Sequence, residues 1–336
     1  MEILDLIRQR ARQKQRKIVL PETTDIRVLK AAKVVVEEKL AQLIILSNDT
    51  AELKEKAQEI GLDLSRLEVV TPLSSEHLDE FSRTFYELRK HKGVSEEEAL
   101  EQVKNPVTFA AMMVRFSLAD GFVAGAITTT ADVAKAAMYC VGFGEKVRTI
   151  SSCFLICVPD CEYGEKGTFI FADCGVVPNP SPMQLANISA SAADLFRILV
   201  QKEPRVALLS FSTKGSASHE MVDKITRTRE IINEKFPDLI ADGEFQLDAA
   251  IVPEVAKIKA PESSVAGSAN VLIFPDLNAG NICYKMAQRL AKAGVIGPIL
   301  NGLKKPCSDL SRGCTIDEIV DAVCTTSIRV VDEVAE

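Results

Sequence analysis

The chain has 336 residues, of which 47% are hydrophobic, and its 40 Lys and Arg against 47 Asp and Glu give a formal net charge of −7. This length is enough for two domains, because a single hydrophobic core stops growing at roughly 250–300 residues. The acidic balance argues against a nucleic-acid binder, which needs a basic surplus for phosphates, and no apolar run approaches the ~20 residues that span a bilayer. The N-terminal segment lacks the apolar stretch of a secretion signal, so we expect an intracellular, cytoplasmic protein.

Apolar strands alternate with amphipathic helical segments along the first part of the chain. Strands are predicted at residues 18–20, 43–46, 68–70 and 121–124, with helices between them at 25–39, 51–60 and 75–90. The strands are continuous apolar runs, which is typical of a sheet covered by helices on both faces. Repeated β–α units with right-handed crossovers then predict a parallel sheet in three layers. The fold class is α/β.

The β–α rhythm breaks near residue 147, where two strands across one turn predict a hairpin at 150–158 and 168–171. It then resumes, with helices at 183–200, 218–236 and 279–292, strands at 206–211 and 269–274, and a last helix from Thr315. We place a second boundary at Gly297-Pro298. The prediction is a discontinuous first domain, residues 1–146 plus 298–336, and a second domain, residues 147–297.

The nine cysteines, in a chain without an export signal, are expected to be reduced and mostly buried. They form no CxxC pair, and the closest cluster, Cys153, Cys157 and Cys161, lacks neighbouring histidines, of which the chain has three in all. A zinc site would therefore lack its usual ligands. We expect no metal and no tightly bound cofactor.

Residues 125–132 follow the predicted strand at 121–124 and open a helix. Ligands of α/β sheets bind where loops leave the carboxyl ends of strands. Three threonine hydroxyls and free backbone N–H groups at this helix start predict an anion site, and Lys135, one turn on, adds a cation. The alternative is an ordinary helix N-cap with additional threonines.

The segment 309–320 carries Thr315 at an N-cap position and Glu318 three residues later, the pattern of a capping box. That structural interpretation accounts for both residues without any function. It leaves Ser311 and Arg312 unexplained, and an Arg beside a helix start presents a fork for phosphate or for a developing oxyanion.

Three further cations have both a structural and a functional interpretation. Arg89 ends a predicted helix, where the helix dipole alone favours a cation. Lys285 and Arg289 are spaced i, i+4, so that both heads share one helix face with no matching acid close by, an arrangement that fits a polyphosphate.

Taken together and in order, these segments resemble the motifs of phosphate acetyltransferases (phosphotransacetylases) of the phosphate acetyl/butyryltransferase family. The matching stretches are ADGFVAG at 119–125 leading into TTAD at 129–132, FADCGVVPNP at 171–180, LSFSTKGS at 209–216, GNICYK at 280–285 and DLSRG at 309–313. The resemblance covers essentially the whole chain.

The resemblance implies reversible transfer of an acetyl group between acetyl phosphate and coenzyme A, which is a co-substrate. It also implies two αβα domains of the isocitrate/isopropylmalate dehydrogenase kind with mainly parallel sheets, an active-site cleft between them, and a homodimer. The residue roles it implies are Arg89, Lys135 and Thr130 for acetyl phosphate, Ser311 and Arg312 at the coenzyme A thiol, Lys259, Lys285 and Arg289 for coenzyme A phosphates, and Glu318 as general base.

Two positions depart from the family's pattern. Lys135 stands where the family usually has Arg, so it keeps the charge but loses the bidentate fork. Glu318 stands where the catalytic acid is commonly Asp, and the neighbouring Asp317 is the second choice for the base. The alternatives are a phosphate butyryltransferase, a β-decarboxylating dehydrogenase, whose nicotinamide site and acidic metal cluster we do not find, a cysteine acyl-enzyme route, and a non-catalytic coenzyme A or phosphate sensor.

Overall fold

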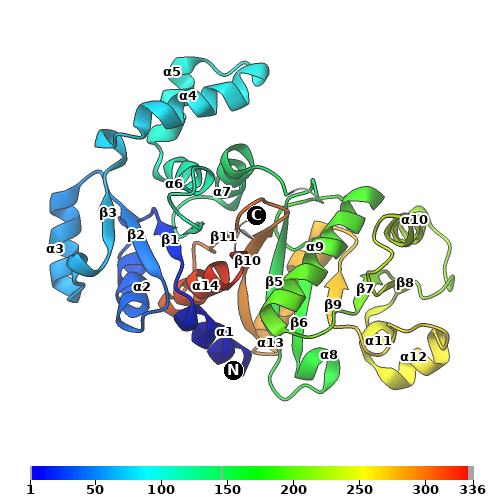
Figure 1. The fold of residues 1–336 in the computed structure, drawn as a ribbon. Helices are drawn as coiled ribbons and strands as arrows, with labels where there is room; N and C mark the ends of the chain where they lie inside the picture. Colours follow the sequence, from blue (N-terminus) through cyan, green and yellow to red (C-terminus); the bar gives the residue numbers. More distant parts are fainter. Residues whose placement is uncertain (1, 145–146, 332–336) are drawn as a thin grey trace, which may run out of the picture. The chain divides into compact units, whose positions relative to one another are not determined.

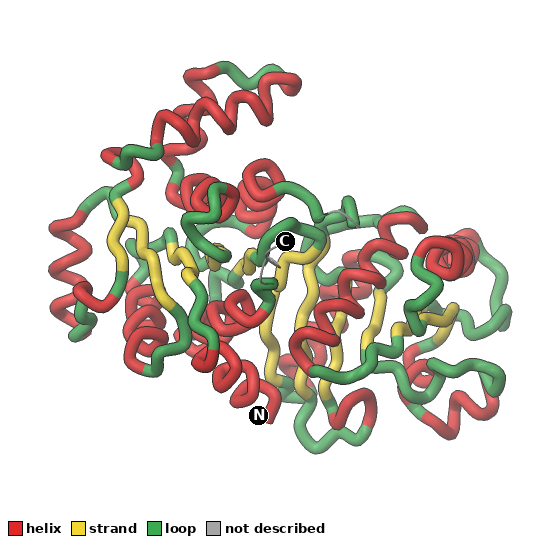
Figure 2. The backbone as a smooth tube through the Cα atoms, in the orientation of Figure 1, coloured by secondary structure: helices red, strands yellow, loops and turns green. Residues whose placement is uncertain are grey.

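The computed structural model describes residues 2–144 and 147–331, which form two compact units. The discontinuous unit contains residues 2–144 and the described residues from Leu303 onward, and the continuous unit contains the described residues from 147 to Gly302. In each unit, strands are flanked by helices (Figure 2). Among the described residues, none of the helices has both the length and the apolar character that crossing a lipid bilayer requires.

The discontinuous unit is built on a five-stranded parallel sheet in the order β3-β2-β1-β4-β11. Its strands are β1 (Lys17–Leu20), β2 (Gln42–Leu46), β3 (Glu68–Val70), β4 (Gly121–Ala124) and β11 (Cys307–Asp309). The chain winds from β1 outward to β3 and then returns to place β4 on the other side of β1. The winding direction therefore reverses between β1 and β4, the kind of switch point at which open α/β sheets bind ligands.

Helices from both ends of the chain complete the discontinuous unit (Figure 1). The C-terminal helix α14 packs against α1 and α2, and Arg8 on α1 pairs with Asp321 on α14 at 2.6 Å. The helices are α1 (Glu2–Gln13), α2 (Ile26–Glu37), α3 (Thr50–Ile60), α4 (Leu78–Arg89), α5 (Glu96–Lys104), α6 (Pro106–Arg115), α7 (Thr130–Ala136) and α14 (Ile316–Ile328), with short 3-10 helices η1 (Leu64–Arg66), η2 (Pro72–Ser74) and η3 (Lys90–Lys92) and the π-helix η4 (Ala137–Val141).

The continuous unit has a mixed sheet in the order β10-β5-β6-β9-β7-β8. The pairs β10–β5 and β5–β6 are antiparallel and the remaining pairs are parallel. The strands are β5 (Ser151–Cys157), β6 (Thr168–Ala172), β7 (Val206–Leu209), β8 (Ala241–Phe245), β9 (Val271–Ile273) and β10 (Gly294–Asn301), and the helices are α8 (Tyr163–Lys166), α9 (Pro182–Val200), α10 (Glu220–Lys235), α11 (Leu247–Ile251), α12 (Pro253–Lys259) and α13 (Leu277–Leu290).

The α/β class and the mainly parallel sheets are as predicted, and the predicted hairpin is the β5–β6 pair. Three strands were not predicted, namely β8, β10 and β11. Gly297-Pro298, where we place the second domain boundary, lies within β10, which pairs with β5 on both sides of that dipeptide and shifts register between Ile296 and Ile299. The division of the chain into the predicted domains stays a prediction.

Candidate functional site

The carboxyl ends of β4 and β11 lie side by side in the discontinuous unit, because Ala124 is paired with Asp309 in parallel register. The loop that leads into α7 and the loop that leads into α14 therefore leave the sheet next to each other. Gly125, at φ +113°, permits this close approach, since a Cβ there would collide with the Asp309 carboxylate and the Leu310 backbone. The structure thus brings the predicted Thr130 segment beside the predicted Ser311 and Arg312 segment.

The carboxylate of Glu22, in the loop after β1, binds the backbone N–H groups of the loop that leads into α7. It accepts hydrogen bonds from the N–H groups of four consecutive residues, 125–128, at 2.7, 2.7, 3.2 and 2.7 Å, and the residue is only 6% exposed. The backbone N–H groups of residues 125–128 are therefore not free for a bound anion, which contradicts our expectation for that half of the segment 125–132. The protein fills this anion site with its own carboxylate.

Arg27, near the start of α2, ties the two loops together. Its guanidinium donates to the carbonyl oxygens of Arg312 and Cys314 at 3.0 and 2.8 Å and to that of Ala126 at 3.1 Å. Asp25 fixes the guanidinium in turn through contacts of 2.6 and 3.1 Å, and the hydrogen bond from Arg27 lowers the pKa of the Asp25 carboxyl. Sequence reasoning missed both Glu22 and Arg27, since each acts through partners remote in the chain.

The α14 loop presents the residues predicted for catalysis. Ser311 and Arg312 are exposed, and among the described residues the Arg312 guanidinium has no hydrogen-bond partner. Thr315 caps α14, and the predicted capping box is confirmed: the Thr315 hydroxyl accepts from the Glu318 N–H, and Glu318 Oε2 accepts from the Thr315 N–H at 2.8 Å. Helix capping therefore explains how the Glu318 carboxylate is held, and its other oxygen, Oε1, has no hydrogen-bond partner among the described residues.

Asp317, the second choice for the base, points elsewhere. Its carboxylate lies 3.5 Å from the guanidinium of Arg8 on α1, although it is largely exposed. Glu318 instead turns back over the N-terminus of its own helix, toward the loop that carries Ser311 and Arg312. The geometry favours Glu318 over Asp317 as the acid of this loop.

Asp309, in β11 directly before this loop, is a buried acid that sequence reasoning did not single out. Neither of its carboxylate oxygens has a well-formed hydrogen bond among the described residues. Burial raises the pKa of Asp309 to about 7, and the nearby Thr130 hydroxyl offsets only part of that effect. Asp309 thus places a buried carboxyl with a raised pKa at the carboxyl end of β11, directly before the loop that carries Ser311 and Arg312.

The two cations predicted for acetyl phosphate approach one helical segment. The Arg89 guanidinium lies over the ring of Tyr139, with 3.7 Å between its central carbon and the ring centroid. Tyr139 belongs to η4, which continues α7, and Lys135 lies about one turn earlier on α7. Lys135 pairs with Asp132 at 3.2 Å on the surface.

The three residues predicted for coenzyme A phosphates all belong to the continuous unit. Lys285 and Arg289 are exposed on α13, as are two apolar side chains, Ile282, three residues before Lys285, and Met286, directly after it. Lys259, at the end of α12, instead has matched partners: it donates to Gln246 at 2.9 Å and to Asp248 at 2.8 Å, which lowers the pKa of the Asp248 carboxyl.

Two other motif segments are also built around buried carboxylates. Asp173 accepts from the Ser152 hydroxyl at 2.6 Å and from the backbone N–H groups of residues 175–177 at 2.9, 3.2 and 2.7 Å. Glu244 accepts from the Ser212 hydroxyl at 3.0 Å and from the Gly215 N–H at 2.7 Å. These acids shape the loops of the FADCGVVPNP and LSFSTKGS motifs, so the backbone N–H groups they bind are not open to phosphate.

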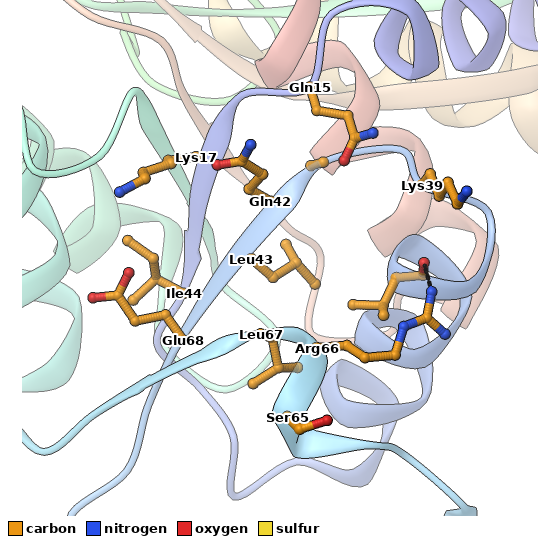
Figure 3. A pocket seen from close by; sticks show the side chains of 12 residues that line it. Gln15, Lys17, Lys39, Gln42, Leu43, Ile44, Ser65, Arg66, Leu67 and Glu68 are labelled. Carbon is orange, nitrogen blue, oxygen red and sulfur yellow. Dashed lines mark hydrogen bonds between the residues drawn. The ribbon is translucent and has the colours of Figure 1, made fainter.

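Two pockets of the discontinuous unit lie at opposite ends of its parallel strands. The pocket in Figure 3 lies at the amino ends of the strands, since Lys17, Gln42 and Glu68 begin β1, β2 and β3. It contains none of the predicted site residues. The other, a crevice of about 380 Å³, lies at the carboxyl ends of the strands and is lined by Glu22 and Thr128, and it too contains none of the predicted site residues. The second position is the one that the fold assigns to ligands.

Comparison with known proteins agrees with this architecture. A family model described as "Phosphate acetyl/butaryl transferase" matches residues 2–327. The phosphate acetyltransferase of Thermoanaerobacterium thermosaccharolyticum is 50% identical over 329 residues, with 98% of this chain and 99% of that protein covered, and the one of Acetivibrio thermocellus is 47% identical, with 98% of each covered. The crystal structure of a phosphotransacetylase from Streptococcus pyogenes has a TM-score of 0.91 at 38% identity and covers 98% of both chains.

These similarities define the protein as a transferase that acts on acyl groups. The chain belongs to the phosphate acetyl/butaryl transferase family, as its motifs predicted, and the relatives named phosphate acetyltransferase favour acetyl over butyryl transfer.

Proposed function

We propose that the protein catalyses reversible acetyl transfer between acetyl phosphate and coenzyme A by direct attack of the thiolate within a ternary complex. The observation that supports this most is the junction of the β4 and β11 loops, which gathers Thr130, Ser311, Arg312 and Glu318 at one sheet edge in the discontinuous unit. The names of the relatives support the same acyl group and acceptor class.

In this mechanism Glu318 acts on the coenzyme A thiol. A thiol with an ordinary pKa of about 8.5 is only a few per cent ionised at neutral pH. The Glu318 carboxylate takes the thiol proton, sulfur attacks the acetyl carbonyl carbon, and the bond from that carbon to the phosphate oxygen breaks. Phosphate leaves with the bonding electron pair. A positioned base of this kind contributes about 10²–10⁴ in rate.

Other side chains of the discontinuous unit stabilise the reacting carbonyl and hold the phosphate in this mechanism. Arg312, exposed and without a partner among the described residues, stabilises the negative charge that grows on the carbonyl oxygen, and Ser311 hydrogen-bonds the reacting group. Arg89, Lys135 and Thr130 hold the phosphate and keep it in line with the attack. The N–H groups of residues 125–128 are occupied by Glu22, so the contacts proposed here for the phosphate come from side chains.

Replacing Tyr139 tests the role of Arg89. A ring under a guanidinium is worth about 0.5–2 kcal/mol, or roughly 2- to 30-fold in affinity. Tyr139→Leu removes the ring and is expected to raise the KM for acetyl phosphate by that factor, whereas Tyr139→Phe keeps the ring and should stay within about two-fold of the wild type. Steady-state kinetics with saturating coenzyme A measure both. Equal KM values for the Leu and Phe variants would remove the ring contact from substrate binding.

Lys285 and Arg289 on α13 are proposed to meet the phosphates of coenzyme A, with Ile282 and Met286 beside them as an apolar surface for its less polar parts. Lys259 is the third candidate, and it has to exchange its bonds with Gln246 and Asp248 for phosphate. We also propose that the chain works as a homodimer in the cytoplasm, with residues 1–146 plus 298–336 and residues 147–297 as its two domains. Coenzyme A serves as co-substrate, with no tightly bound cofactor.

A cysteine acyl-enzyme is the alternative chemistry. Cys314 lies in the α14 loop, but it is buried, and burial raises the pKa of its thiol, which disfavours the reactive thiolate. We expect Cys314→Ser and Cys161→Ser to keep most of the wild-type kcat in the acetyl phosphate and coenzyme A assay. A loss of more than about 100-fold in either variant, with folding intact, would support the acyl-enzyme instead.

The proposed activity is tested by mixing the protein with acetyl phosphate and coenzyme A and following the thioester absorbance. Thioester formation at a rate proportional to enzyme concentration is expected, with butyryl phosphate a poorer donor. Binding of coenzyme A without turnover would identify the non-catalytic sensor, and a faster rate with butyryl phosphate would identify the butyryltransferase.

A further inference from the structure

We infer that Glu22 is a positioning residue for acyl transfer, a built-in anion that occupies the backbone site of residues 125–128 and thereby sets the direction of the Thr130 segment. This inference rests on the proposed function, and it adds to it a residue outside the motif stretches on which the resemblance rests. Glu22 touches no reacting atom in this account. It acts through the loop that it holds.

Glu22 is anchored so that its carboxylate cannot easily turn away. It lies two residues after β1, its carbonyl oxygen accepts from the Asp25 N–H at 3.1 Å, and the Thr23 hydroxyl beside it donates to the Leu46 carbonyl oxygen at 2.5 Å. The side chain is buried, with both carboxylate oxygens directed at the loop 103 or more residues further along the chain. The contact therefore joins the β1 loop to the start of α7.

Both carboxylate oxygens of Glu22 are used in full. Oε2 accepts from Gly125 and Ala126, and Oε1 accepts from Ile127 and Thr128. Four successive N–H groups that converge on one point form a concave anion site, and a carboxylate satisfies all of them at once. Without it, four donors would lack partners, and the loop would lose four of the hydrogen bonds that hold its conformation.

The position of the loop matters for the chemistry because Thr129 and Thr130 follow it directly. Thr129 caps α7 through its bond to the Asp132 N–H, and Thr130 approaches Asp309 at the end of β11. A loop released from Glu22 would move the start of α7 and the Thr130 hydroxyl with it. It would also expose an anion site in the crevice lined by Glu22 and Thr128, where phosphate would bind away from the reaction.

The test uses Glu22→Ala and Glu22→Gln with formate as a chemical substitute for the missing carboxylate. We expect Glu22→Ala to lose at least 100-fold in kcat/KM for acetyl phosphate, with the KM for coenzyme A changed less than about three-fold. Formate, compared with chloride at equal ionic strength, should raise the kcat/KM of Glu22→Ala for acetyl phosphate at least ten-fold and should also raise its Tm. It should change neither value of the wild type. Glu98→Ala removes another loop-binding carboxylate, far from this edge in the α5 capping box, and should keep wild-type kinetics.

Glu22→Gln keeps the shape of the side chain but replaces one acceptor oxygen with a donor that faces N–H groups. It should lose activity without rescue by formate, because the site stays filled. Wild-type kcat/KM in either Glu22 variant, or a folded Glu22→Ala that formate neither stabilises nor reactivates, would overturn the inference. If the wild type itself forms no thioester, the proposed function fails, while the Tm response of Glu22→Ala to formate still decides whether the site accepts an anion.

Discussion

Glu318→Gln is expected to lower kcat by at least 100-fold while the KM values for acetyl phosphate and coenzyme A change less than about three-fold. The amide cannot take the thiol proton, and general base catalysis contributes about 10²–10⁴ in rate. Folding should be preserved, because Gln serves in a capping box as well as Glu does, and the acceptor for the Thr315 N–H is kept at the start of α14. Steady-state kinetics and the melting temperature of the variant measure the two effects separately.

Two neighbouring variants serve as controls for Glu318→Gln. Thr315→Ala removes the capping hydroxyl and should cost about 1 kcal/mol of stability with a much smaller effect on kcat. Asp317→Asn alters the acid that faces Arg8 and should keep most of the activity. A Glu318→Gln variant with near-normal kcat, or an Asp317→Asn variant with the larger loss, would move the base away from Glu318.

Asp309→Asn is expected to change the pH dependence of stability between pH 4 and pH 7. Burial raises the pKa of Asp309 from 3.8 to about 7 in the folded protein, so the native state binds more protons than the unfolded chain between these values. The stability linked to this carboxyl is fully present below pH 4 and is lost as the pH rises to 7. The wild type should lose about 1.4 kcal/mol per pH unit in this range relative to Asp309→Asn, or a few kcal/mol in total.

Urea unfolding of both proteins from pH 5 to pH 8 measures this difference directly. We expect the free energy of unfolding of the Asn variant to increase relative to that of the wild type as the pH rises, and this difference to become constant above pH 7. A constant difference across the range would mean that Asp309 is ionised throughout, and the interpretation of its burial would then be wrong.

The part of the fold that local patterns govern was predictable from the sequence. Continuous apolar runs placed β1 to β4, and the spacing of Thr315 and Glu318 predicted the capping box that the structure contains. Two of the three strands that escaped prediction have weaker patterns: β8 reads ADGEF and β11 reads CSD, and neither has the apolar run of a buried strand. Their place is set by pairing with β7 and β4, which no short window of sequence records.

The site was predictable at its motifs but not at the residues that hold it. Threonines after a strand indicated an anion site, yet the occupant of the loop is Glu22, more than 100 residues earlier in the chain. Arg27 joins two loops that lie 99 and 285 residues further along the chain, through carbonyl oxygens that every residue carries. Contacts to backbone atoms leave no mark in the partner's residue type, so a single sequence could not reveal them.

Isotope exchange tests most directly whether the acetyl group passes straight from phosphate to sulfur. The wild-type enzyme is incubated with acetyl phosphate and labelled inorganic phosphate, either without coenzyme A or with a catalytic amount of it. We predict that label enters acetyl phosphate only when coenzyme A is present, because the acetyl group leaves phosphate only for the thiol. Label entering acetyl phosphate without coenzyme A would reveal an acetyl-enzyme and contradict direct transfer.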